Sequence, residues 1–233
     1  MGHFDNITGK ELSNKIVEEA KKLGADFLGI ANVSGFLDES YQGTKPQDFM
    51  KDARTVIILG ISVPKESLES LPRGRGEYTN TLVAVSATLR MIAFRLARNL
   101  EKEGYKAVIV PPEGDEFGHA RSDRKTPKAN ISTKYAAYLS GLGKYGINHL
   151  LLTEGFGPRV RMTAIVTDTP LETGCPQKGI FDERCATCLR CVSICPAGAL
   201  DKAGNIDRQK CADYMSNALG GLRCGLCVKV CPL

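Results

Sequence analysis

Eight of the nine cysteines in this 233-residue chain lie after residue 184. They are Cys185, Cys188, Cys191, Cys195, Cys211, Cys224, Cys227 and Cys231. The spacing C-x2-C-x2-C-x3-C-P begins at Cys185, and its second half, C-x2-C-x3-C-P, returns at Cys224. The stretch has short segments in place of long apolar runs, so we expect its folding to be coupled to whatever the thiols bind.

The first run has the spacing of bacterial ferredoxins that hold two [4Fe-4S] clusters, in which three close cysteines bind one cluster and the fourth, before proline, binds the other. Applied to this chain, the pattern assigns cluster 1 to Cys185, Cys188, Cys191 and Cys231. Cluster 2 receives Cys195, Cys224 and Cys227, but Gly221 stands where a strict repeat would have its remaining cysteine. Cys211 is predicted to fill that place.

Two other uses of these cysteines stay open. C-x2-C pairs also bind zinc, although the triplet and the two Cys-Pro endings favour iron-sulfur clusters. Disulfides are disfavoured in a chain expected to be cytoplasmic. The ninth cysteine, Cys175, lies outside the pattern and is interpreted as a free structural thiol.

Upstream of the cysteines, helical and strand patterns alternate. Thr8 to Glu11 spell a capping box, and apolar residues then recur at helical spacing until Gly24. Further helices are predicted over 81–104 and 132–140, and strands over 26–31, 55–61, 106–110 and 159–167. The alternation predicts one α/β domain. The pattern changes between residues 172 and 180, which predicts an α/β domain over 1–174 and a double-cluster module over 175–233.

Composition excludes several classes of protein. With 42% hydrophobic and 24% charged residues the chain is neither disordered nor fibrous. Its apolar runs are shorter than the roughly 18 residues of a membrane span. No export signal is recognisable at the N-terminus, so we expect a cytoplasmic protein without a membrane partner.

The formal charge of +5 raises the question of a nucleic-acid partner. Two clusters with their thiolates, each about −2, would lower the charge to about +1. The basic residues are also scattered along the chain. We therefore expect no stable nucleic-acid binding, and the segments 73–78 and 119–128 are predicted basic loops.

The stretch GLGKYG, residues 141–146, matches the dinucleotide-binding motif G-x-G-x-x-G. That motif is specific only where a strand precedes it and a helix follows. Here a predicted helix precedes it. The pattern therefore favours a glycine-rich turn that lets the backbone approach a ligand or a neighbouring segment.

One longer stretch, SGLGKYGINHLLLTEGFGPRVRMTAIVTDTPL at 140–171, together with the eight cysteines, resembles epoxyqueuosine reductases and corrinoid-dependent reductive dehalogenases. GADFLGIA, RGRGEY and LEKEGYKAVIVPP extend the resemblance upstream. It implies a nitroreductase-like α/β domain that holds a cobamide, with a ferredoxin-like double-cluster module beside it.

The resemblance also implies site residues. The cofactor-binding positions that it suggests are Tyr78, Gly141, Gly143, Gly146, Asn148 and His149. Candidate proton donors are Tyr78, His119 and Tyr145. The aspartate motif that donates the proton in epoxyqueuosine reductases has no match in VPPEGDEFGHA, residues 110–120. The substrates of both families are therefore not carried over.

The leading hypothesis is an oxidoreductase that relays single electrons through two [4Fe-4S] clusters to a bound corrinoid. Its electron donor would be a ferredoxin or a flavodoxin. One alternative is a non-catalytic carrier that reduces a corrinoid held by a partner protein. Another is a flavin in place of the corrinoid on the same fold.

Overall fold

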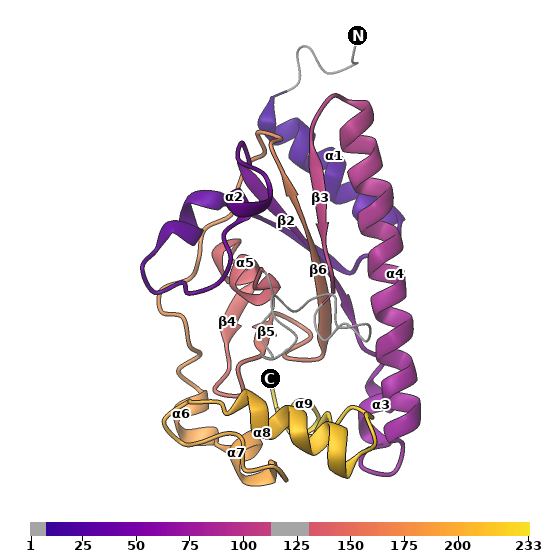
Figure 1. Cartoon of the computed structure of the whole chain (residues 1–233), viewed down its shortest axis with the longest axis vertical. Coiled ribbons are helices and arrows are strands. Elements are labelled where there is room, and N and C mark those ends of the chain that lie inside the picture. Colours follow the sequence, from indigo (N-terminus) through magenta and orange to yellow (C-terminus); the bar gives the residue numbers. More distant parts are fainter. Residues whose placement is uncertain (1–7, 113–130) are drawn as a thin grey trace.

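The computed structural model describes residues 8–112 and 131–233 (Figure 1). The first part of the chain forms α1 (Gly9–Lys22), β1 (Phe27–Asn32), η1 (Val33–Leu37), α2 (Pro46–Phe49), β2 (Thr55–Ser62), α3 (Lys65–Glu69), α4 (Arg75–Lys102) and β3 (Ala107–Val110). After the gap come α5 (Thr133–Leu139), β4 (Gly143–Tyr145), β5 (Leu151–Thr153) and β6 (Val160–Thr167). The cysteine-rich end forms α6 (Cys185–Cys188), α7 (Arg190–Ile194), α8 (Arg208–Asp213), η2 (Tyr214–Ala218) and α9 (Leu226–Lys229).

Helix α1 begins at the predicted capping box. The Thr8 hydroxyl accepts a hydrogen bond from Glu11 N at 3.3 Å, and Thr8 N donates to the Glu11 carboxylate at 2.9 Å. Two backbone N–H groups that the first turn leaves without helical partners are thereby satisfied. Leu12, Ile16 and Ala20 form the buried face of the helix. The predicted helix is confirmed.

A four-stranded sheet with the order β1-β2-β6-β3 forms the centre of the domain, and all three pairings are antiparallel. Side chains of β2 alternate between its faces, so that Val56 and Ile58 join one core while Ile57 and Leu59 join the other. Both faces are covered, which is why this strand reads as a continuous apolar run. The predicted mixed α/β fold is confirmed, with an antiparallel sheet.

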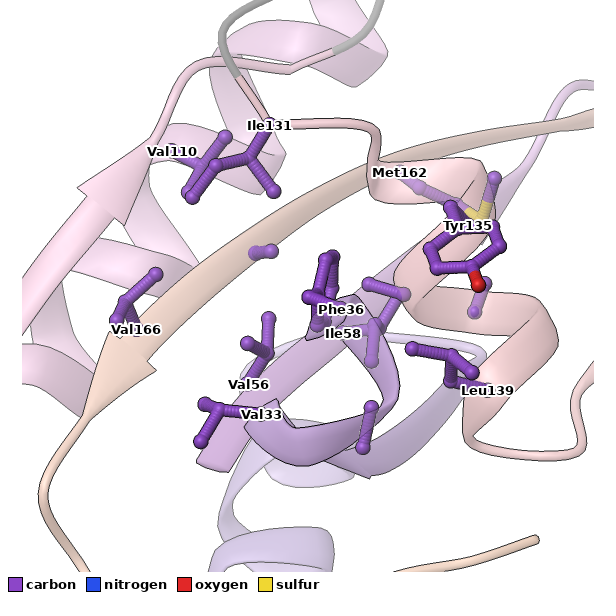
Figure 2. Close-up of a cluster of buried hydrophobic side chains, with 14 of the residues drawn as sticks. Val33, Phe36, Val56, Ile58, Val110, Ile131, Tyr135, Leu139, Met162 and Val166 are labelled. Carbon is purple, nitrogen blue, oxygen red and sulfur yellow. The ribbon is translucent and has the colours of Figure 1, made fainter. Parts of the chain in front are cut away.

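Helices lie on both faces of the sheet (Figure 1). One face packs against α1 and α4 through Leu89, Leu96 and their neighbours. The other face packs against η1 and α5, where Phe36, Tyr135 and Met162 gather around the strands (Figure 2). Phe36 and Tyr135 meet edge to face, with ring centroids 5.6 Å apart. The result is a three-layer arrangement in which the cysteine-rich segment lies below the sheet (Figure 1).

Helix α4 begins at Arg75, six residues before the predicted start. Tyr78 and Leu82 are buried against Val63, Leu68 and Leu71. This contact extends the apolar face of the helix by almost two turns. The prediction of a basic loop over residues 73–78 is therefore wrong for Arg75 onward, because tertiary packing outweighs the low helix propensity of the glycines in RGRGEY. The other predicted basic loop, 119–128, lies outside the described residues.

The cysteine-rich end has almost no core of its own. After residue 171, the buried residues are Cys185, Ala199 and Leu200 among those that the structure describes. The segment instead docks on the α/β part, where Leu226 and Val228 pack against the buried apolar side chains around Tyr78 and Leu71. Where the boundary between two domains falls stays a prediction.

The two cysteine repeats share a backbone feature. The two repeats of C-x2-C-x3-C-P begin at Cys188 and Cys224. The residues that directly follow these cysteines, Leu189 and Gly225, both have a positive φ, of 50° and 68°. Each is followed by a short helix, α7 or α9. The internal repeat of the sequence is thus a repeat of local conformation as well.

The core of the α/β part gives a first prediction. Leu89 is fully buried in α4, so Leu89→Ala should lower the free energy of unfolding by about 2–5 kcal/mol through lost burial and a cavity. Met91, two residues on, is 54% exposed, and Met91→Ala should change it by less than about 0.5 kcal/mol. Denaturant unfolding followed by circular dichroism under anaerobic conditions measures both. Equal losses would contradict the assigned helix face.

A second prediction concerns the docking contact. A Cβ on Gly225 would lie 2.5 Å from the Tyr78 ring and 2.7 Å from Leu71, whereas one on Gly220 would meet nothing within 4 Å. Both glycines have positive φ. Gly225→Ala should therefore destabilise the protein by about 1–3 kcal/mol more than Gly220→Ala, since only the first adds overpacking to backbone strain. Thermal unfolding compares the two variants, and a larger loss for Gly220→Ala would contradict the packing.

Candidate functional site

A cavity of about 630 Å³ lies between the α/β part and the cysteine-rich end. Its walls include Tyr78 and Leu82 of α4, Arg161 of β6, and the loop that follows β4. Four cysteines complete the lining, namely Cys195, Cys211, Cys224 and Cys227. These are the four thiols that the sequence assigned to cluster 2.

A second cavity of about 180 Å³ is lined by the other predicted set, Cys185, Cys188, Cys191 and Cys231. Ile147, Leu152, Leu189 and Leu233 give it an apolar wall. Asn148 lines both cavities, so the two lie next to each other. The structure thus brings each predicted set of four thiols together around its own space.

Interactions among the thiols mostly follow the same division, although Cys191 of the smaller cavity also contributes to the raised pKa of Cys227. Burial, together with the neighbouring Cys211 and Cys224, raises the pKa of Cys227 to about 12. Burial also raises the pKa of Cys211, with Cys195 and Cys224 adding to the effect. In the other set, burial raises the pKa of Cys231, with further contributions from Cys185 and Cys188. Four neighbouring thiols, most of them partly buried, are costly to ionise together unless a cationic group binds them.

No three His, Cys, Asp or Glu side chains converge tightly enough to hold a single metal ion within residues 8–112 and 131–233. Two sets of four thiolates around separate cavities suit the chemistry of [4Fe-4S] clusters, which cysteine thiolates bind. The donor set therefore fits the implied group. Cys175 lines neither cavity and is exposed.

The loop that carries Cys224 and Cys227 is held by hydrogen bonds from the α/β part. Arg75 Nη1 donates to Cys224 O at 3.0 Å, and Asn148 Nδ2 donates to Cys227 O at 3.4 Å. Lys229 Nζ donates to the carbonyl oxygens of Glu69 and Leu71 at 2.7 and 2.6 Å. These contacts fix the loop against α3 and the start of α4.

Three of the predicted cofactor-binding residues line the larger cavity: Tyr78, Asn148 and His149. Tyr78 is 5% exposed, and burial raises its pKa to about 12, with Cys227 adding to the rise and Arg161 opposing it. His149 Nε2 lies 2.7 Å from Gly204 O, and burial lowers the pKa of this imidazole. Their role in cofactor binding stays a prediction.

Of the other candidate proton donors, Tyr145 in β4 also lines the larger cavity. Its ring packs edge to face against Phe181, with centroids 6.2 Å apart. His119 lies outside the described residues.

The glycines of GLGKYG serve close approach between backbone segments. A Cβ on Gly141 would lie 2.5 Å from Cys175 O, and one on Gly143 would lie 2.1 Å from Leu152 O in the paired strand β5. Gly146 lines the smaller cavity, whereas Gly141 and Gly143 line neither. Helix α5 precedes the motif and strand β4 lies within it, which is the reverse of a dinucleotide-binding unit.

Several residues of the larger cavity were not predicted. Five of them are basic: Lys134, Arg159, Arg161, Arg208 and Arg223. They come from separate elements, so no local spacing links them. The one sequence signal was the position of Arg223 directly before Cys224.

No helix in the described parts of the chain is both long and apolar enough to cross a membrane.

No family model matches the chain. Related sequences are nevertheless found in two families. An epoxyqueuosine reductase from Bacillus anthracis is 22% identical over 256 residues, which cover 96% of this chain and 64% of the relative. Another from Lactococcus garvieae is 29% identical, over 86% of this chain and 58% of the relative. A tetrachloroethene reductive dehalogenase from Desulfitobacterium hafniense is 28% identical, over 83% of this chain and 34% of the relative.

Solved structures of both families have the same fold. A catabolic reductive dehalogenase superposes with a TM-score of 0.73 at 20% identity, covering 98% of this chain and 32% of the other. Epoxyqueuosine reductase from Bacillus subtilis superposes with a TM-score of 0.66 at 19% identity, covering 97% and 66%. The chain thus spans about two thirds of the length of epoxyqueuosine reductases and one third of that of dehalogenases. The chain is a homologue of epoxyqueuosine reductases and reductive dehalogenases and shares their fold, as the resemblance in its sequence predicted.

Proposed function

We propose that this chain is an iron-sulfur oxidoreductase that passes single electrons through two [4Fe-4S] clusters to a corrinoid in the larger cavity. The observation that carries the proposal is the shared wall between the cavities. One set of four thiols lines a space of about 180 Å³, and the other set lines the space of about 630 Å³ that opens into the α/β part. Homology to two families of reductases supports the same class of reaction.

Each group has its own residues in this proposal. Cys185, Cys188, Cys191 and Cys231 hold cluster 1, and Cys195, Cys211, Cys224 and Cys227 hold cluster 2. When bound, the clusters supply single electrons at low potential and the corrinoid supplies the reductive chemistry. The large cavity with its mixed apolar and polar wall fits a large ligand that accepts electrons beside cluster 2.

The protein contributes position and potential. Ala199 N lies 3.4 Å from Cys195 Sγ and donates a hydrogen bond to it, a contact of the kind that raises cluster potentials. Cys188 is exposed, whereas Cys227 is part of the junction with the α/β part. Electrons from a ferredoxin or flavodoxin would therefore enter at cluster 1 and leave at cluster 2.

Tyr78 is the proton donor that we propose first. Its phenol lies in the wall of the larger cavity and keeps its proton at neutral pH. Tyr145 lines the same cavity and is the second candidate.

The cavity favours a ligand in this chain over the carrier hypothesis, because a carrier needs no such space beside its second cluster. A flavin would use the same space.

An epoxyqueuosine reductase has been solved with a tRNA stem loop. For this chain we keep the expectation of no stable nucleic-acid partner.

The ligand assignment gives a paired prediction. Cys211→Ser should lower the iron content of the reconstituted protein from about eight to about four or seven per chain, depending on whether cluster 2 is lost or keeps three irons. Cys175→Ser should leave it near eight. Iron and sulfide assays on anaerobically purified protein measure this. The assignment fails if Cys175→Ser loses iron while Cys211→Ser does not. If both variants keep about eight irons per chain, a group other than cysteine completes cluster 2.

The cofactor gives a second prediction. The anaerobically reconstituted protein should retain cob(II)alamin on filtration and change its EPR spectrum, because the larger cavity surrounds the corrinoid. Extraction of the purified protein separates the three hypotheses, since it yields a corrinoid, a flavin or neither. An unchanged spectrum with no retention would favour the carrier.

A further inference from the structure

The outer side of α4 lacks the charged residues that normally cover a surface helix. From residue 78 to residue 94 the sequence has one charged residue, Arg90, which is half-buried. Val83, Met91 and Phe94 are 39%, 54% and 47% exposed. A helix that is apolar all round is normally buried on all sides. The inner side of α4 packs on the sheet, so its outer side has the composition of a second interface.

The exposed residues of α4 form one stripe along the helix. Positions three, four and seven apart lie on the same side of a helix, and every seventh residue from Glu77 to Arg98 is exposed. Figure 1 shows α4 along the right-hand edge of the molecule, with the sheet to its left. The full set is called the α4 stripe below: Glu77, Asn80, Val83, Ala84, Ala87, Thr88, Met91, Phe94, Arg95 and Arg98.

The two ends of the α4 stripe carry opposite charges. Glu77 lies at its start, and Arg95 and Arg98 lie at its end. Neither Glu77 nor Arg95 has an ion pair within residues 8–112 and 131–233. Arg98 lies over the ring of Phe94, 5.8 Å from its centroid, which leaves the positive charge in place. A surface with opposite charges at its two ends is complementary to a second copy of itself that runs the other way.

The middle of the α4 stripe has the shape for close packing against a helix. Ala84, Ala87 and Thr88 are small, so two helix axes can approach to about 8–10 Å there. On either side of these residues, Val83 and Met91 offer larger apolar side chains to bury. The spacing of three and four residues is that of a seam between two helices.

We propose that two copies of this chain form a dimer through their α4 stripes, with the two helices antiparallel. A pair centred on Ala87 brings Glu77 of one copy level with Arg95 and Arg98 of the other, to within about 3 Å along the axis. The arrangement occurs at both ends because a two-fold axis relates the copies. A parallel pair would place the arginines of the two copies side by side, which is unfavourable. The inference is independent of the proposed function.

A membrane surface fits the α4 stripe less well than a second copy. Helices that lie on membranes present large apolar residues such as Trp, Phe and Leu, flanked by Lys and Arg. The middle of the α4 stripe has small residues instead, and Glu77 and Asn80 lie at one end. Antiparallel pairing also leaves the two cysteine-rich ends at opposite ends of the dimer, because this segment lies beside the start of α4 (Figure 1).

The test measures the mass of the anaerobically purified full chain by sedimentation equilibrium. A dimer has a mass of about 50 kDa, twice the 25.2 kDa of one chain. One pair of helices makes a small interface, so we expect a Kd of roughly 10–100 μM. A thiol reductant is present throughout, since a disulfide between two exposed Cys175 side chains would also link two chains.

Substitutions at exposed positions separate the interface from the fold. Ala87→Glu places a carboxylate beside that of the other copy and should raise the Kd more than about tenfold. The matched control is Ala203→Glu, at an exposed position of the cysteine-rich end, which should leave the Kd unchanged. Circular dichroism and iron content check that each variant is folded.

Charge reversal tests the antiparallel order. The double variant Arg95→Glu with Arg98→Glu sets acidic residues opposite Glu77 and should raise the Kd about tenfold. Adding Glu77→Arg should return the Kd to near its original value, which a mere loss of packing would not allow. A triple variant that dimerises no better than the double variant would contradict the antiparallel order.

Three results would overturn the proposal itself. One is the mass of a single chain at concentrations about tenfold above the expected Kd. Another is a dimer whose Kd does not respond to Ala87→Glu. The third is a monomer that floats with vesicles of phosphatidylglycerol, which would assign this face to a membrane surface. Failure of the proposed function would appear elsewhere, in the iron content and the cob(II)alamin spectrum.

Discussion

The structure depends on holding eight thiols in two sets with a segment that has little core of its own. Beyond residue 171, Cys185, Ala199 and Leu200 are the buried residues in the described part of the chain. A stretch this poor in burial cannot offset the conformational entropy of folding by apolar contacts. Its order depends on docking on the α/β part and, in the proposed function, on the clusters that the thiols would hold. The contact of the loop around Gly225 with Tyr78 and Leu71 therefore matters to both halves of the molecule.

The same contact determines where chemistry can occur. Helix α4 packs on the sheet through Leu89 and Leu96, and its first turns carry Tyr78 to the thiols of the second set. Because the loop of Cys224 and Cys227 is tied to α3 and α4, the cavity walls come from both parts of the chain. A ligand in that space would be surrounded by thiols on one side and by basic side chains such as Arg161 and Arg223 on another. A cysteine-rich segment that folded apart from the sheet would provide no such enclosure.

Local signals were predictable from the sequence, and long-range ones were not. The capping box at Thr8, the apolar run of β2 and the helical spacing of apolar residues in α4 each lie within one element. Rules that use only neighbouring residues could therefore predict them. The division of the thiols came from spacing alone, and the cavities follow it. The antiparallel strand order, the early start of α4 at Arg75 and the gathering of Arg161, Arg208 and Arg223 depend on contacts between distant segments. No pattern within one element carries that information.

The most direct test of the account asks whether cluster 2 is the neighbour of the bound cofactor. Cob(II)alamin would be added to the dithionite-reduced protein, and its EPR relaxation measured by power saturation. The account predicts fast relaxation, caused by a nearby paramagnetic cluster, that changes in Cys211→Ser, where cluster 2 is lost or keeps three irons, and stays unchanged in Cys188→Ser. Relaxation that depends on Cys188 and not on Cys211 would contradict the assignment of the larger cavity and the direction of the relay.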